Sequence, residues 1–151
     1  MLNVQPAGIE TQAPLVDLAD EAERRRLTPA ALKAFFRIIS AWDVSAAVGR
    51  ALMGGVSNGK YQELKRRIED GTADDVRPLS QDELQRISYL IGITKALRIL
   101  HGPDLADRWM TLPNRNRIFG GRAPVDYATA GGIPALIEIR RLLDARRGMN
   151  A

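Results

Sequence analysis

The 151-residue sequence holds few side chains that could carry out covalent or metal chemistry. It contains no cysteine and a single histidine, His101, which excludes a thiol nucleophile, a disulfide and a Cys/His zinc site. A Ser–His–Asp arrangement would have to use His101. This residue stands directly before Gly102 and Pro103 and is more simply explained as a helix-terminal residue near backbone carbonyls. We therefore expect a protein that is not an enzyme and uses neither a metal nor a cofactor.

The sequence is richer in side chains that could contact DNA, which follow a Gly-Gly turn. Asn and Gln side chains can pair with adenine edges, and Lys and Arg side chains reach guanine or phosphate oxygens. Residues 43–67 have the outline of a helix-turn-helix, whose second helix faces bases with its N-terminal residues. Asn58, Lys60 and Gln62 are expected to read bases, and Lys65 and Arg66 to hold phosphates. The full set of expected DNA-binding residues is Ser57, Asn58, Lys60, Gln62, Lys65 and Arg66.

Two features of this segment depart from a compact helix-turn-helix. The turn holds two adjacent glycines, Gly54 and Gly55, and is longer than usual, while Gly59 weakens the start of the second helix by about 1 kcal/mol relative to Ala. Tyr61 and Leu64 nevertheless fall where the second helix of such a motif packs on the first. The alternative is a helical hairpin whose basic face is only solvated.

The elements that would position these residues all follow the helical repeat, and no stretch alternates with the period of a strand. Thr28 can cap a first helix with Pro29 at its first position. A second helix is expected from about Val44 to Met53 with Asp43 as its cap, and a third, with Ser57 as its cap, to about Glu69. The apolar stripe of the first helix is Leu32, Phe35, Phe36, Ile39 and Trp42.

A second group of helices is predicted after residue 79. Ser80 and Glu83 form a capping box in front of a long apolar helix that ends at Gly102-Pro103. Asp104 can cap a brief helix through Trp109, and Pro124 and Pro134 are placed to start helices, the last of which ends at Gly148. The predicted fold class is all-α, with a helix-turn-helix followed by a small helical domain.

Charge and hydropathy agree with this division. The formal charge is +4 and the pI about 9.8, with net charges of −2 over residues 1–26, +3 over 27–71 and +3 over 72–151. We expect an N-terminal arm (1–26), a DNA-binding domain (27–71), a linker (72–79) and a second domain (80–151). The sequence has no apolar stretch long enough for a membrane span and no secretory signal, so we expect a cytoplasmic protein.

The second half of the sequence carries four motifs in a fixed order. They read R-I-x-x-L-x-G-I-x-x-A-L from Arg86 to Leu97, W-x-x-x-P-N from Trp109 to Asn114, G-R-x-P-x-D from Gly121 to Asp126, and R-x-x-L-D-A from Arg140 to Ala145. Together they strongly resemble the toxin-binding domain of the Xre/MbcA/ParS antitoxin family. The resemblance covers about the last half of the chain.

The resemblance implies a two-part antitoxin with an N-terminal Xre-type helix-turn-helix. Its partner would be a RES-domain or ParT-like toxin, which degrades NAD or uses it for ADP-ribosylation. Such an antitoxin occludes the toxin's NAD pocket, and operator DNA binding by the antitoxin or the complex represses the shared operon. A homodimer that joins the toxin in a larger hetero-oligomer is expected, because helix-turn-helix readers usually work as two-fold pairs.

Arginines in the second domain are suited to an acidic partner or to a pocket built for phosphates. The expected toxin-binding residues are Arg122, Asp126, Arg140, Arg141 and Arg147. Two alternatives stay open. One is a solitary helix-turn-helix regulator with a helical dimerisation domain and no toxin, and the other is a protein-interaction adaptor that binds no DNA.

Overall fold

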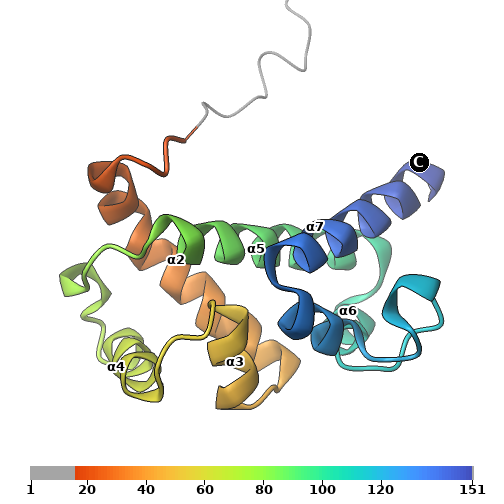
Figure 1. Cartoon of the computed structure of the whole chain (residues 1–151), viewed down its shortest axis with the longest axis horizontal. Helices are drawn as coiled ribbons and strands as arrows, with labels where there is room; N and C mark the ends of the chain where they lie inside the picture. Colours follow the sequence, from red (N-terminus) through yellow and green to blue (C-terminus); the bar gives the residue numbers. More distant parts are fainter. Residues whose placement is uncertain (1–15, 151) are drawn as a thin grey trace, which may run out of the picture.

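The computed structural model describes residues 16–150, and within this range the chain forms helices and no strands (Figure 1). The predicted all-α class is therefore confirmed. The α-helices are α2 (Glu21–Trp42), α3 (Ala46–Leu52), α4 (Asn58–Glu69), α5 (Gln81–Leu100), α6 (Pro103–Trp109) and α7 (Pro124–Asn150). Two 3-10 turns, η1 (Ala73–Asp75) and η2 (Arg117–Phe119), lie between them. No helix within the described range is long and apolar enough to cross a membrane.

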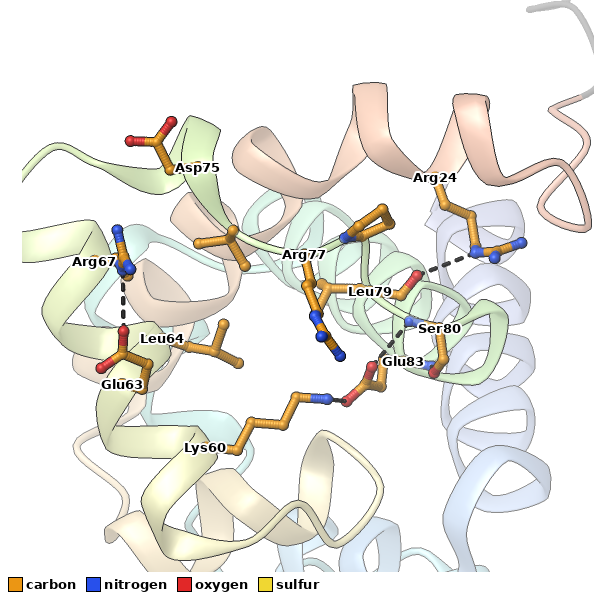
Figure 2. A pocket seen from close by; sticks show the side chains of 12 residues that line it. Arg24, Lys60, Glu63, Leu64, Arg67, Asp75, Arg77, Leu79, Ser80 and Glu83 are labelled. Atoms are coloured by element: carbon orange, nitrogen blue, oxygen red, sulfur yellow. Dashed lines mark hydrogen bonds and ion pairs between the residues drawn. The ribbon is translucent and has the colours of Figure 1, made fainter.

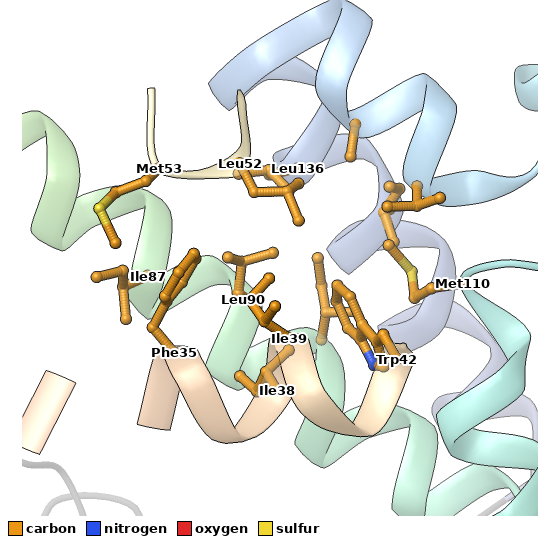
Figure 3. Close-up of a cluster of buried hydrophobic side chains, with 14 of the residues drawn as sticks. Phe35, Ile38, Ile39, Trp42, Leu52, Met53, Ile87, Leu90, Met110 and Leu136 are labelled. Carbon is orange, nitrogen blue, oxygen red and sulfur yellow. The ribbon is translucent and has the colours of Figure 1, made fainter. Parts of the chain in front are cut away.

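One hydrophobic core joins both halves of the chain. Long helices α2 and α5 cross at its centre, α3 and α4 lie on one side, and α6 and α7 lie on the other (Figure 1). Phe35 of α2, Leu52 of α3, Leu90 of α5 and Leu136 of α7 point into the same space and are each at most 2% exposed (Figure 3). Burial of large side chains such as these stabilises a fold by about 1.5–3 kcal/mol each. The residues of the predicted first and second domains thus share a single cluster.

Helix α2 begins earlier than predicted. Its N-cap is Asp20, whose side chain accepts a hydrogen bond from the Ala22 amide, and Thr28 and Pro29 lie inside the helix. The prediction that Thr28 caps this helix was wrong. A threonine can stand at the N-cap or inside a helix, and the residue type alone does not tell the two positions apart. The Thr28 hydroxyl donates to the Arg24 carbonyl at 2.7 Å, one helical turn earlier, as interior threonines do. The part of the predicted arm before residue 16 lies outside the described residues.

The linker before α5 is attached to α2 through the same threonine. The Leu79 amide donates to the Thr28 hydroxyl at 2.9 Å, and the Arg24 guanidinium donates to the Leu79 carbonyl at 3.2 Å. Both backbone polar groups of the buried Leu79 are therefore satisfied by α2 side chains. This contact fixes the entry of the chain into α5.

The capping predictions have mixed outcomes. Ser57 caps α4 and the Ser80–Glu83 capping box begins α5, as predicted. Asp43 does not cap α3: it lies in the left-handed region (φ 53°) at the end of α2, and Ser45 caps α3 instead. An Asp tolerates the left-handed conformation better than most residues, which favours it as the C-cap that follows α2.

Two further helix ends differ from the predictions. Helix α6 begins at Pro103 with Gly102 as its N-cap, so Asp104 lies in the first turn rather than at the cap. Helix α7 continues through Gly148 to Asn150, so Gly148 does not end it. The expected break between two proline-started helices is present as a kink at Gly132 (φ 65°, ψ −146°), which gives α7 two helical parts.

Candidate functional sites

The α3–α4 pair packs closely around Tyr61. A Cβ atom at Gly49 of α3 would lie 2.8 Å from Cζ of Tyr61, so the close approach requires glycine at this position. The Tyr61 ring is 2% exposed and makes edge-to-face contacts with Phe35 and Phe36 of α2, at centroid distances of 6.4 and 5.3 Å. Burial raises the pKa of the Tyr61 phenol. The predicted packing role of Tyr61 is confirmed.

The turn between α3 and α4 is fixed by a hydrogen bond from α3 and by packing against α5. Gly54 and Gly55 have φ values of 106° and 86°, which L-residues with a side chain rarely adopt. Arg50 of α3 donates to the Val56 carbonyl at 2.9 Å across the turn. A Cβ at Gly54 would lie 3.0 Å from Asp82 and 3.1 Å from Arg86, which form a 2.8 Å ion pair on α5. The turn therefore rests on the first two turns of α5.

The predicted DNA-binding residues are all exposed but occupy different faces of α4. At about 100° per residue, Asn58, Gln62 and Arg66 form an i, i+4, i+8 stripe along the outward face of α4. Arg66 is nearly opposite the buried Tyr61 and Leu64, whereas Asn58 lies at the edge of this face nearest Lys65. Lys65 lies on the flank toward α2. Ser57 is the N-cap, and its hydroxyl accepts from the Lys60 amide at 3.1 Å. Asn58, Gln62 and Arg66 therefore form one continuous stripe of side chains that can contact bases or phosphates.

Lys60 lies on the opposite flank of α4, toward α5 (Figure 2). Its ammonium forms a 2.8 Å ion pair with the carboxylate of Glu83, whose side chain is only 9% exposed. The pair borders a pocket of about 670 Å³ between α4 and residues 75–83. Arg77 points into this pocket in Figure 2. Lys60 therefore connects α4 to the start of α5 and does not share the outward face with Asn58 and Gln62.

Glu83 is the most strongly constrained carboxylate of this region. It accepts hydrogen bonds from the Ser80 amide at 2.9 Å and from Lys60 at 2.8 Å. Burial raises the pKa of Glu83, but the hydrogen bonds from Lys60 and Ser80 together outweigh it and hold the pKa below its ordinary value of 4.5. Glu83 is therefore ionised at neutral pH.

On the outward face of α4, Glu63 organises two arginines. It pairs with Arg66 and, at 3.0 Å, with Arg67. Hydrogen bonds from Arg66 and Arg67 lower the pKa of Glu63. All three groups face solvent, so the pairing orients the guanidinium groups more than it stabilises the fold.

The predicted toxin-binding residues fall into two groups. Arg122, just before α7, and Asp126, in its first turn, are both exposed, and Arg122 lines a shallow hollow of about 300 Å³. The Arg122 guanidinium lies 5.8 Å from the Tyr127 ring centroid, and Glu138 across the hollow pairs with Arg141 at 3.5 Å. Arg122 and Arg141 thus lie near one surface, together with Tyr127 and Glu138, which the sequence analysis did not select.

Arg140 and Arg147 form the other group, on a separate stripe of α7. Both pair with Asp144, at 3.1 and 3.6 Å. Arg140 also crosses α5 at Gly92, where an added Cβ would lie 3.0 Å from Cζ of Arg140. Gly92 is the glycine of the R-I-x-x-L-x-G-I motif, so part of that motif serves the contact between α5 and α7. Within residues 16–150, no group of three or more His, Asp or Glu side chains is arranged to hold a metal.

The chain is similar in sequence to a known protein family and to a bacterial protein. Residues 95–148 match the family described as the antitoxin Xre/MbcA/ParS C-terminal toxin-binding domain. The chain is also 36% identical over 121 residues to the uncharacterized protein y4oB of Sinorhizobium fredii, which covers 80% of this chain and 86% of that protein. No solved structure matches the chain. The chain therefore belongs to the Xre/MbcA/ParS antitoxin family, which supports an antitoxin role and implies a toxin partner.

Proposed function

We propose that this protein neutralises a RES-type, NAD-degrading toxin by covering its active site, without enzymatic activity of its own. The match of residues 95–148 to the toxin-binding domain carries this proposal. That segment includes α6, α7 and the loop between them, and it displays Arg122, Asp126 and Arg141 at its surface. A pocket built for the phosphates of NAD suits arginine side chains.

We further propose that the α3–α4 pair binds operator DNA and so autoregulates the operon. Supporting this are the exposed Asn58, Gln62 and Arg66 on one face of α4, and a turn that is fixed on α5. Asn58 and Gln62 are the proposed base readers, whereas Lys60 is better explained as an anchor to Glu83. We propose a homodimer as the DNA-binding form, since two-fold pairing is usual for such readers.

The toxin half of the proposal is tested by co-expression with the product of the neighbouring gene. Affinity purification should recover a complex, and the chain should suppress NAD loss caused by that product. Each of the substitutions Arg122→Ala and Arg141→Ala should raise the Kd of the complex about tenfold, as expected for central contacts. The matched control is Arg25→Ala, an exposed arginine of α2 outside the matched segment. A neighbour that neither binds nor consumes NAD would contradict the toxin proposal and leave the solitary regulator.

The DNA half is tested separately, by fluorescence anisotropy with the duplex directly upstream of the coding sequence and a scrambled duplex of equal length. Asn58→Ala/Gln62→Ala should remove the preference for the upstream duplex while leaving non-specific binding. If the chain binds neither duplex, alone or in complex with the toxin, it acts as a protein-interaction module.

A further inference from the structure

A groove of about 560 Å³ lies between α2 and α4, on the flank of α4 that faces away from Glu83. Its charged lining residues are Lys33 and Arg37 of α2 and Lys65 and Glu69 of α4. All three cations are exposed. Neither the sequence motifs nor the family match, which begins at residue 95, includes Lys33 or Arg37.

The cations of this groove differ from those on the other flank of α4. There, Lys60 is paired with Glu83 and Arg67 with Glu63. Within residues 16–150, by contrast, no carboxylate lies within 4.0 Å of the charged nitrogens of Lys33, Arg37 or Lys65. The α2 flank therefore presents positive charge that is available to a partner.

The spacing of these cations forms a row. Lys33 and Arg37 are one helical turn apart on the same face of α2, and Ser40 continues this row to a length of about 10 Å. Successive phosphates of one DNA strand advance about 3.4 Å along the duplex axis, so the row can follow two or three of them. Phe36 and Ile68, both half-buried, add apolar lining of the kind that deoxyribose can contact.

We propose that Lys33 and Arg37 of α2, together with Lys65 of α4, bind the phosphate backbone of one DNA strand beside α4. This inference rests on the proposed DNA binding by the α3–α4 pair. A helix lying in the major groove has a phosphate strand along each flank, and the α2 flank carries the unpaired cations. Helix α2 thereby positions the outward face of α4 on the duplex without reading sequence itself.

The test is the salt dependence of DNA binding by the full chain, measured by anisotropy with the upstream duplex and the scrambled duplex. Each lost phosphate contact reduces the slope of log K against log salt by about 0.9. Lys33→Gln/Arg37→Gln should therefore reduce the slope by about 2 and weaken binding to both duplexes by the same factor. Lys33→Arg/Arg37→Lys keeps the charge and should keep the wild-type slope.

The matched control is Arg115→Gln/Arg117→Gln, which removes two exposed arginines from the loop before α7, on the other side of the molecule from α4 (Figure 1). It should change the slope by much less than the α2 pair. Equal slopes for the two double variants would overturn the inference while leaving the proposed DNA binding intact. A loss of toxin binding instead of DNA binding in Lys33→Gln/Arg37→Gln would assign the row to the protein partner and also overturn it. If the wild-type chain binds neither duplex, the proposed DNA binding fails and this inference fails with it.

Discussion

Substitution Gly49→Ala tests the close packing of α3 on α4. The new Cβ would lie 2.8 Å from Cζ and 3.1 Å from Cε1 of Tyr61, well inside the 3.5–4.0 Å of a favourable carbon contact. Tyr61 cannot rotate away, because it is 2% exposed and enclosed by Phe35 and Phe36. Overpacking of this kind costs up to about 3 kcal/mol, and the higher helix propensity of Ala returns about 1 kcal/mol. The expected net loss is about 2 kcal/mol, or a Tm lower by roughly 4–8 °C.

The assay is thermal and urea unfolding of Gly49→Ala beside two further variants. Gly59→Ala is the matched control, since no atom lies within 4 Å of its added Cβ, and it should stabilise the protein by up to about 1 kcal/mol. Tyr61→Phe removes the phenol oxygen, the atom nearest to the new Cβ, so the double variant should recover part of the loss. Equal effects of Gly49→Ala and Gly59→Ala would refute the packing argument.

Two other predictions concern the attachment of α5. Thr28→Val keeps the shape of the side chain but leaves the buried Leu79 amide without its acceptor, so the free energy of unfolding should fall by about 1–3 kcal/mol. Thr28→Ser should keep most of that stability in the same urea titration, and an unchanged midpoint for Thr28→Val would contradict the role of this hydrogen bond. Lys60→Met should cost about 1 kcal/mol at pH 7 because Glu83 loses its ion-pair partner. Since the folded state lowers the pKa of Glu83 below 4.5, this stabilisation is present above pH 4.5 and is lost as the pH falls through the folded value. Unfolding curves that stay separated at pH values far below 4.5 would exclude the ion pair as the cause.

The structure connects the proposed DNA-binding elements to the start of α5 at two points. Lys60 of α4 pairs with Glu83, and the Gly54 turn rests on Asp82 and Arg86. Arg86 also lies near the α7 kink, where an added Cβ at Gly132 would lie 3.7 Å from its guanidinium. The α3–α4 turn and the kink that precedes the second part of α7 therefore contact the same α5 side chain.

Local sequence signals predicted several elements correctly because they depend on few neighbouring residues. The capping box at Ser80 and Glu83, the Ser57 cap and the packing role of Tyr61 all follow from residue type and helical spacing. The start of α2 was predicted wrongly, because a Thr-Pro pair is typical of the first residues of a helix whereas Thr28 and Pro29 lie inside α2. Their interior position depends on Asp20 and on the bond from Leu79, 51 residues away.

The sequence by itself predicted the helical fold seen over residues 16–150, excluded cysteine chemistry and, through four ordered motifs, pointed to an antitoxin family. The first two follow from helical periodicity and composition, whereas the family follows from the resemblance of the motifs to a known domain. Only the tertiary structure decided which cations are available to partners. It pairs Lys60 with Glu83 and lays Arg140 across Gly92, while leaving Lys33 and Arg37 exposed beside Lys65. The physical reason is that the availability of a charge depends on which carboxylates and backbones other helices bring within about 4 Å.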